Sequence, residues 1–374
     1  MTNILQDAIG NCCEARFCSD VCPLLKNSAP ADLAQAVLSE NVPQGVIDSV
    51  STCSLCGLCN EACPSGVNIR NLIKRARGCL VEKGAVNPEW YRHLWVDHDW
   101  NVFTLFRKEY GLDNVYQDLI KDHCTTLFMP GCVLAMEGPR LVRLVANWLS
   151  RQGEDTGVSV QCCGAILDQM GTEERAERYS SQLWDQIRRT GARQVVTACP
   201  NCQARMLETK QASEVTVVSL FQLMAEAGVE VPASGARRVT VHDSCSDREG
   251  RIGAHVRALL KNQQLVEMPH HGRNTICCGS GGVVSAIAPE LCRERAEQRL
   301  QEVRDTKADT CVTYCMSCAH RLGAGTGANI RHILELVFQE TVDHQEFDSK
   351  AVALFEGERG QENYDLLQHS KLSV

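Results

Sequence analysis

The cysteines of this chain form a repeat, and this repeat constrains the fold more than any other feature of the sequence. Two sets of five cysteines follow each other at offsets of 113 to 116 residues. The first five-cysteine set is Cys132, Cys162, Cys163, Cys199 and Cys202, and the second five-cysteine set is Cys245, Cys277, Cys278, Cys315 and Cys318. Offsets that vary so little over this length indicate one structural unit present twice in tandem.

Both sets follow the same pattern of expected strands and helices. Short apolar segments typical of strands lie shortly before cysteines, at residues 125–129, 194–198, 238–242 and 310–314. Segments with helical character separate them, so we expect two α/β units, each with a largely parallel sheet. The cysteines then fall at strand ends, where folds of this class bind ligands.

The adjacent cysteines in each set require a turn. Neighbouring residues of an extended chain point to opposite faces, so a pair such as Cys162-Cys163 can address one metal centre only from a turn. Gly164 and Gly279 follow the two pairs directly, and glycine permits the positive φ that such a turn uses. Five thiols exceed the four that a cubane cluster needs. A zinc site on four of them, with one thiol idle, is the alternative.

A different cysteine motif lies nearer the N-terminus. The run Cys53-x2-Cys56-x2-Cys59-x3-Cys63-Pro64 has the spacing of bacterial ferredoxins, in which the fourth cysteine usually ligates the other cluster of a pair. Zinc sites use paired Cys-x2-Cys motifs and not this triple spacing. The run therefore predicts two iron–sulfur centres that exchange ligands. One of them would take Cys22, Cys53, Cys56 and Cys59.

The motif for the other centre is incomplete. Exchange assigns to this centre three thiols, those of Cys12, Cys18 and Cys63. Ala15 occupies the position where a further cysteine is expected. Either Cys13 provides the fourth ligand of a [4Fe-4S] cluster, or the site holds a [3Fe-4S] cluster, or it is vestigial. We favour Cys13, because adjacent cysteines also occur in both five-cysteine sets.

The sequence predicts an α+β multidomain protein, in which an α-helical ferredoxin domain precedes two tandem α/β domains related by the repeat. The expected segments are a two-cluster domain, an aromatic-rich helical linker, the two repeats and a polar tail, at residues 1–85, 86–124, 125–235, 236–340 and 341–374. In the first domain, a helical stretch is expected to break at Pro43. A further helix over residues 67–83 is expected to stop at Gly84.

Composition limits the compartment and the partners. With 374 residues, 22 cysteines and 44% hydrophobic residues, the chain can build its cores without disulfides. No export signal or membrane-spanning run is apparent, so we expect a cytoplasmic protein without a transmembrane segment. The net charge of −8 disfavours a nucleic-acid partner. The basic stretch at residues 70–77 is expected to be a solvated helix face or a docking surface for an acidic partner.

Several further residues are singled out by type and position. His242 ends an expected strand and lies three residues before Cys245. It could donate a hydrogen bond to a metal ligand, relay protons or serve as a structural turn residue. Four cysteines outside the motifs are expected to be small buried residues, namely Cys79, Cys124, Cys292 and Cys311.

Together, the ferredoxin run and the doubled Cys…Cys-Cys-Gly…Cys-x2-Cys (CCG) motif resemble the iron–sulfur subunits of the heterodisulfide reductase family. Similar subunits occur in anaerobic glycerol-3-phosphate dehydrogenase and in glycolate and lactate oxidase systems. The resemblance implies two ferredoxin-type clusters and, on all five thiols of each five-cysteine set, one noncubane [4Fe-4S] cluster. It also implies a flavoprotein donor in an anaerobic complex. Further iron–sulfur or membrane subunits could hold that complex at the inner face of the membrane.

Two functions follow from this resemblance. In the first, the chain relays electrons from a flavoprotein to the CCG clusters and on to a quinone or another acceptor. In the second, it reduces a disulfide. The second five-cysteine set with His242 would be the catalytic centre, and the first set with Gly164 and Gly279 would bind a cofactor cluster. A redox sensor, the third alternative, would need an effector surface that is not visible. No flavin or nicotinamide motif is apparent, so we expect an oxidoreductase subunit active only within a complex.

Overall fold

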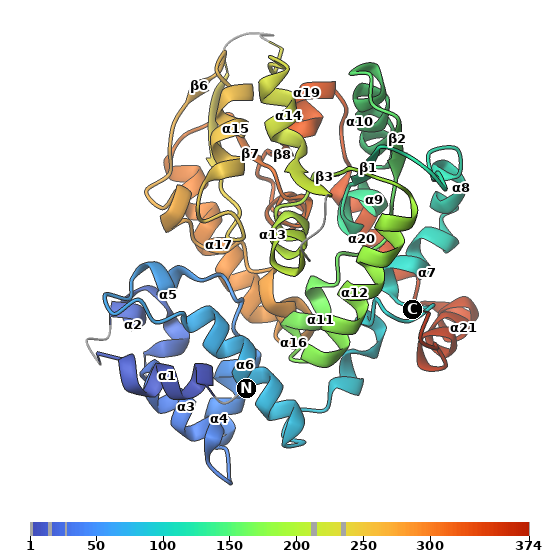
Figure 1. Ribbon diagram of the computed structural model, residues 1–374. Coiled ribbons are helices and arrows are strands. Elements are labelled where there is room, and N and C mark those ends of the chain that lie inside the picture. The colour runs from blue at the N-terminus through green and yellow to red at the C-terminus, as the bar shows by residue number, and fades with distance from the viewer. Residues whose placement is uncertain (1–2, 14–16, 27, 211–214, 233–236, 374) are drawn as a thin grey trace.

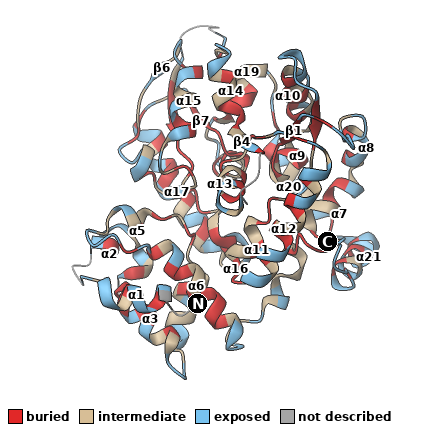
Figure 2. Cartoon of the chain, viewed as in Figure 1, coloured by how far each residue is buried: buried red, intermediate tan, exposed pale blue. Residues whose placement is uncertain are grey.

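The computed structural model describes residues 3–13, 17–26, 28–210, 215–232 and 237–373. A helical unit at the lower left of Figure 1 precedes two α/β units, which lie above it. This mixture of helices and strands agrees with the sequence prediction. Buried residues concentrate in the strands and in the inner turns of the helices, whereas outer helices such as α21 (Gly357–Gln368) are largely exposed (Figure 2).

The N-terminal unit is helical throughout its described residues. Its elements are α1 (Asn3–Asn11), α2 (Phe17–Val21), η1 (Pro23–Leu25), α3 (Pro30–Leu38), α4 (Gln44–Ser51), α5 (Leu58–Glu61) and α6 (Ile69–Glu82). Helices α1, α3 and α6 pack around Leu5, Leu33 and Leu72, which are buried. As predicted, Pro43 separates α3 from α4, and α6 ends shortly before Gly84, whose φ is +68°.

Each α/β unit contains a four-stranded parallel sheet, and the two sheets have the same topology: β2-β1-β3-β4 and β6-β5-β7-β8. The strands are β1 (Thr126–Met129), β2 (Thr156–Val158), β3 (Gln194–Thr197), β4 (Thr216–Ser219), β5 (Arg238–His242), β6 (Gln264–Leu265), β7 (Thr310–Thr313) and β8 (Ile330–His332). The central strands β1, β3, β5 and β7 are those predicted from the sequence. The flanking strands β2, β6 and β8 have only two or three residues, too few to show a periodic pattern. The fourth flanking strand, β4, has four residues, of which only Ser219 is buried.

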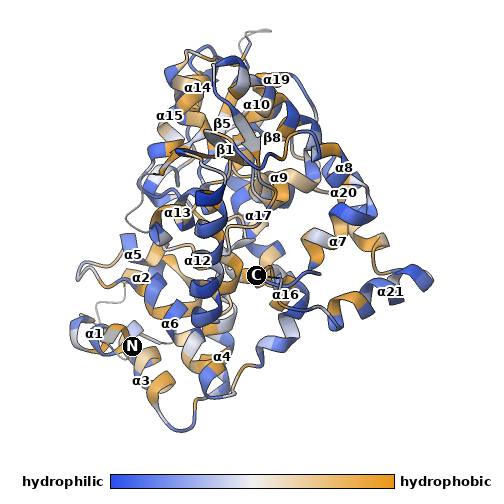
Figure 3. Ribbon diagram, turned by 45° about the vertical axis from the view of Figure 1, so that its right-hand side comes forward, coloured by the Kyte–Doolittle hydropathy of each residue, from blue (hydrophilic) through white to orange (hydrophobic). Residues whose placement is uncertain are grey.

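Helices connect the strands, as parallel pairing requires. In the first α/β unit they are α9 (Cys132–Glu137), α10 (Pro139–Arg151), α11 (Ala165–Gln169), α12 (Glu173–Arg189), α13 (Pro200–Thr209) and α14 (Leu220–Glu226). In the second they are α15 (Arg251–Leu259), η3 (Gly272–Asn274), η4 (Gly281–Val283), α16 (Val284–Ile287), α17 (Pro289–Asp305), α18 (Met316–Gly323) and α19 (Ile333–Phe338). Figure 3 shows α12 as predominantly hydrophilic, yet its Leu183 and Ile187 are buried.

One hydrophobic core joins the two α/β units. Phe128 and Phe221 of the first unit belong to the same buried cluster as Val241 and Tyr314 of the second. The rings of Phe221 and Tyr314 lie 6.3 Å apart in an edge-on arrangement. The shared core therefore fixes the two repeats relative to each other.

The linker and the C-terminal segment fold together. The linker forms η2 (Pro88–Leu94), α7 (Val102–Glu109) and α8 (Leu112–Tyr116), and the segment expected as a polar tail forms α20 (His344–Ala353) and α21. Arg92 donates hydrogen bonds to the carbonyl oxygens of Leu367 and Ser370, and the rings of Phe106 and Phe347 lie 4.8 Å apart. The C-terminal segment is thus docked helical structure, stabilised by the linker aromatics.

The described parts of the chain contain no helix that is both long and apolar enough to cross a membrane.

Candidate metal centres

The thiols of the N-terminal unit gather in two cavities. A largely apolar cavity of about 110 Å³ is lined by Cys22, Cys53, Cys56 and Cys59. A smaller cavity beside Pro64 and Val67 is lined by Cys12, Cys13, Cys18 and Cys63. The structure thus brings together the thiols that ligand exchange assigns to each centre, and Cys13 joins the smaller group. Ala15 lies outside the described residues.

Backbone geometry shapes the larger of these cavities. Leu55 and Gly57 adopt left-handed φ values of +51° and +72°, which fold the loop around the thiols. The Leu55 N–H points at the Cys53 sulfur, 3.4 Å away. Burial, followed by the nearby thiols of Cys53 and Cys56, raises the pKa of Cys59. The surroundings therefore favour the neutral form of the Cys59 thiol.

The first five-cysteine set lies at the carboxyl ends of β1 and β3. Cys132 begins α9, Cys199 is the N-cap of α13, and Cys202 lies in the first turn of that helix. The pair Cys162-Cys163 precedes α11, and Gly164 adopts a φ of +79° at the expected turn. The Cys132 and Cys162 sulfurs are 3.9 Å apart.

The second five-cysteine set repeats this arrangement at the ends of β5 and β7. Cys315 is the N-cap of α18, Cys318 lies in its first turn, and the sulfurs of Cys278 and Cys318 are 3.3 Å apart. Gly279 adopts a φ of +98°, and a Cβ at this position would lie 2.4 Å from the Cys292 carbonyl oxygen. Only glycine therefore fits at this turn. The N–H of Gly279 donates to the Cys277 sulfur at 3.2 Å, as the N–H of Gly164 does to the Cys162 sulfur at 3.5 Å.

The ten thiols form one continuous series in which each interacts with the next. The order is Cys132, Cys162, Cys163, Cys202, Cys199, Cys315, Cys318, Cys278, Cys277 and Cys245. Cys199 and Cys315 join the two sets. At the other end, Cys277 and Cys245 interact electrostatically with Cys56, and Cys277 also lines the larger N-terminal cavity. The second five-cysteine set therefore lies next to the ferredoxin loop, and the first set follows it in the series.

This donor set fits iron–sulfur clusters. Thiolates are soft ligands that select iron–sulfur clusters, zinc or copper(I). Hydrogen bonds to neighbouring thiols, and then burial, raise the pKa of Cys202 and of Cys318 well above the usual range. A bound metal centre would stabilise these neighbouring thiols in their ionised form, because coordinating thiols lose their protons.

The two five-cysteine sets share a cavity of about 390 Å³. Nine of the ten thiols line it, all except Cys277. Apolar side chains such as Phe103, Val133 and Ile166 provide much of the remaining wall, and Arg321 contributes a positive charge. A cavity of this size and lining can admit a small, mainly apolar molecule with a polar or anionic group.

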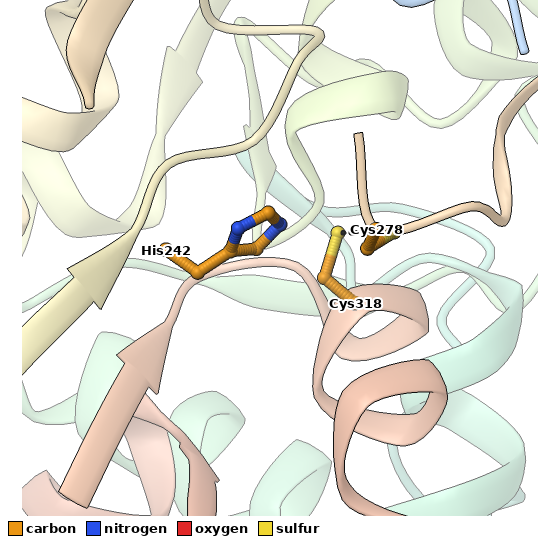
Figure 4. Close-up of side chains that lie close together, drawn as sticks. All are labelled: His242, Cys278 and Cys318. Atoms are coloured by element: carbon orange, nitrogen blue, oxygen red, sulfur yellow. Dashed lines mark hydrogen bonds between the residues drawn. The ribbon is translucent and has the colours of Figure 1, made fainter. Parts of the chain in front are cut away.

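His242 lies against the second set, at the end of β5. One of its ring nitrogens and the sulfurs of Cys278 and Cys318 all lie within 4.8 Å of one another (Figure 4). Its Nδ1 accepts a hydrogen bond from Nε of Arg299 at 2.9 Å. Burial, reinforced by the Arg299 charge, lowers the pKa of His242 to about 3, so the ring is neutral. The sequence singled out His242 but not Arg299.

One buried arginine and two half-buried ones join the ferredoxin loop to the α/β units. Arg77 donates hydrogen bonds to five carbonyl oxygens, those of Val50, Ser51, Cys53, Gln169 and Gly282. Arg248 donates to the Cys56 carbonyl oxygen, and Arg295 donates to the Thr52 carbonyl oxygen and the Ser54 hydroxyl. These contacts hold the loop that carries Cys53 and Cys56 against the second five-cysteine set.

The basic stretch at residues 70–77 is therefore not simply a solvated face. Arg77 is buried, Lys74 pairs with Asp168 at the end of α11, and Arg75 pairs with Glu82 and Glu173. Lys74 and Arg75 thus dock acidic residues of the same chain. The four cysteines outside the motifs are buried, as the sequence predicts.

Comparisons with known proteins agree with this geometry. Residues 8–67 match the family model of the 4Fe-4S dicluster domain, and residues 126–207 and 239–323 each match that of the cysteine-rich CCG domain. One subunit of the dihydromethanophenazine-dependent CoB–CoM heterodisulfide reductase of Methanosarcina acetivorans is 26% identical over 79% of this chain and 76% of its own length. The chain therefore combines a 4Fe-4S dicluster domain with two CCG domains, and its relatives include heterodisulfide reductase subunits.

Other relatives are subunits of different oxidoreductases. One subunit of the CoM/CoB fumarate reductase of Methanothermobacter marburgensis is 24% identical over 82% of this chain and 66% of its own length. The glycolate oxidase iron–sulfur subunit of Escherichia coli is 22% identical over 88% of this chain and 93% of its own length. The chain is accordingly an iron–sulfur electron-transfer subunit of an oxidoreductase.

Proposed function

We propose that the chain relays electrons from a flavoprotein partner to an acceptor that binds in the cavity between the two CCG units. The observation that carries this proposal is the order of the thiols, which runs from the N-terminal cavities through Cys56 and Cys277 to the shared cavity. Iron–sulfur clusters bound at these thiols would accept and release one electron at a time.

The residues have distinct roles in this scheme. The Cys12, Cys13, Cys18 and Cys63 group and the Cys22, Cys53, Cys56 and Cys59 group would each hold a [4Fe-4S] cluster, and each five-cysteine set a noncubane one. Arg77, Arg248 and Arg295 keep the ferredoxin loop seated, so that the distance for electron transfer stays short. The glycine turns exclude side chains from the thiols. Partner subunits would hold this cytoplasmic chain at the inner face of the membrane.

The preferred acceptor is a quinone. Reduced flavin in the partner would release two electrons and two protons, and the quinone would take up two electrons and two protons to become the quinol. The largely apolar cavity walls suit a quinone ring. No flavin or nicotinamide motif is apparent in the sequence, so a partner subunit would supply the electrons.

Disulfide reduction is the second candidate, and a specific observation favours it. Thiols from both five-cysteine sets line the same cavity, so a disulfide bound there would face both centres. It would take up two electrons and two protons and leave as two thiols.

Stopped-flow reoxidation distinguishes the two candidates. Anaerobic full-length protein, reduced with dithionite, is mixed with a water-soluble naphthoquinone or with a mixed disulfide of two small thiols, and the cluster absorbance is followed. The proposal expects rapid reoxidation by the naphthoquinone and slow reoxidation by the disulfide. The reverse order would assign disulfide reduction. Oxidation of NADH or of a hydroxy acid by the isolated chain would contradict the need for a flavoprotein.

A further inference from the structure

The two CCG units differ at the position three residues before their first cysteine. His242 ends β5, three residues before Cys245, and the residue three positions before Cys132 at the end of β1 is Met129. Both side chains are buried. The backbone donors at the two turns are matched, since Gly164 and Gly279 each direct an N–H at a sulfur. The histidine is therefore an additional feature of the second unit.

Arg299 fixes the tautomer of His242. Its guanidinium is fully buried, and Nε donates to Nδ1 of His242 at 2.9 Å, while Nη1 donates to the His270 carbonyl oxygen and to Glu302. An arginine has only donors and does not lose its proton in proteins, so Nδ1 must be the acceptor. The ring then carries its single proton on Nε2.

The Nε2–H group has a sulfur beside it. Nε2 is buried and has no hydrogen-bond partner among the described residues. Figure 4 shows the ring turned so that its outer nitrogen lies on the side of the Cys318 sulfur. A buried N–H group without a partner is costly, and the sulfurs of Cys278 and Cys318, within 4.8 Å of a ring nitrogen, are candidate acceptors. Because Nε2 carries the proton, it has no lone pair with which to bind a metal.

We propose that His242, positioned by Arg299, donates an N–H···S hydrogen bond to the second five-cysteine set and gives that centre a higher reduction potential than the first. Reduction adds negative charge to a cluster, and a hydrogen-bond donor and a buried cation stabilise that charge. The first unit has no counterpart. At the matching positions of α12 stand Leu183 and Trp184, and at the end of β1 stands Met129. His242 is thus a positioning residue for the potential and not a ligand.

This asymmetry gives the second centre a defined role. Electrons that leave the ferredoxin loop at Cys56 meet the second set before the first. A higher potential there would hold an electron next to the shared cavity until the first centre is also reduced. An acceptor that needs two electrons could then receive both. The inference rests on the proposed function only in requiring iron–sulfur centres at both sets.

The test is a redox titration monitored by electron paramagnetic resonance on anaerobic holoprotein. His242→Met copies the first unit and is expected to lower the midpoint potential of the second centre with the iron content unchanged. His242→Gln, whose amide can still donate a hydrogen bond, is expected to keep the midpoint potential of the second centre closer to the wild-type value. Met129→Leu is the matched control and should leave the second centre at its wild-type potential. An unchanged potential in His242→Met with full iron content would overturn the inference.

A measurement on the unsubstituted protein avoids any effect on folding. Electron–nuclear double resonance should detect a weakly coupled nitrogen and an exchangeable proton at the second centre. A strongly coupled nitrogen would identify His242 as a ligand, and the absence of any nitrogen coupling would show that the hydrogen bond is not formed. Either result overturns the inference. Failure of the proposed function itself would look different, because iron would be missing from the wild-type CCG units.

Discussion

At the scale of single residues, Gly282 sets how closely the second CCG unit approaches the ferredoxin loop. Its φ is +64°, and a Cβ would lie 2.2 Å from the Cys53 carbonyl oxygen. We expect Gly282→Ala to lower the free energy of unfolding by more than the cost of about 1 kcal/mol for a positive φ alone. Amides of residues 50–56 should also exchange faster with deuterium. Gly191→Ala is the control, with a φ of +72° and no atom within 4 Å. Equal effects of the two variants would show that the close approach is unimportant.

The cysteine groups could be predicted residue by residue because their spacing is local and chemically specific. The buried arginines could not, since an arginine becomes part of the site only when carbonyl groups from distant segments surround it. The sequence contains one indication that Arg77 is buried. It lies four and eight residues after Ile73 and Ile69, on the face of α6 that the apolar residues bury. For Arg299 the sequence offers no comparable signal, because its partner His242 lies 57 residues away.

At the scale of secondary-structure elements, Arg77 joins α6 to the ferredoxin loop and to both α/β units. Substitution by methionine leaves five carbonyl oxygens without their donor. We expect Arg77→Met to lower the free energy of unfolding by about 3 kcal/mol or more, measured by denaturant titration of the holoprotein. Lys83→Met removes a single exposed hydrogen bond near the end of the same helix and should cost far less. Similar losses of unfolding free energy in both variants would show that Arg77 does not join α6 to its neighbours in this way.

The docking of α20 should depend on pH. Glu137 accepts hydrogen bonds from Nδ1 of His320 at 2.7 Å and from Nδ1 of His344 at 2.9 Å. Burial opposes ionisation at both Glu137 and His344. The hydrogen bonds and charge attraction outweigh it, so the pKa of Glu137 is lowered and the pKa of His344 is raised.

The contribution of protonated His344 to the stability of the docked α20 is fully present below about pH 6.5, the pKa of an unfolded histidine. It is lost as the pH rises through the raised pKa of His344 in the folded protein. We therefore expect faster hydrogen–deuterium exchange in residues 344–353 at pH 8.5 than at pH 6, after correction for the intrinsic rate. His344→Gln should remove this difference, whereas His369→Gln, which changes an exposed side chain of the same segment, should retain it. If exchange of residues 344–353 in the wild type did not depend on pH, the contact between Glu137 and His344 would not stabilise the docking of α20.

The elements that could be predicted are those with a strong local pattern. The central strands and α6 were recognisable from apolar runs bounded by cysteine or glycine. The flanking strand β6 has two exposed residues and exists because β5 provides a partner. The C-terminal helices α20 and α21 show only a weak pattern, because few of their side chains, among them His344 and Leu367, are buried.

At the scale of the whole molecule, the shared cavity is where the two CCG units act together. Ile166→Trp should partly fill it, since Ile166 lines the cavity. We expect reoxidation by the naphthoquinone to slow roughly tenfold, equivalent to about 1.4 kcal/mol of binding, with ferricyanide oxidation and iron content unchanged. Leu207→Trp, on the exposed face of α13, is the matched control. Unaltered quinone kinetics in Ile166→Trp would place the acceptor elsewhere.

The central claim is that four groups of thiols, arranged in one series, hold iron–sulfur clusters. Iron, zinc and acid-labile sulfide in anaerobically purified full-length protein test it most directly. The account predicts about 15 or 16 irons per chain, with similar sulfide and no stoichiometric zinc, because three groups would each bind four irons and the group of Cys12 would bind three or four. About eight irons together with one or two zinc ions would contradict it, since the CCG units would then be zinc sites outside the electron path.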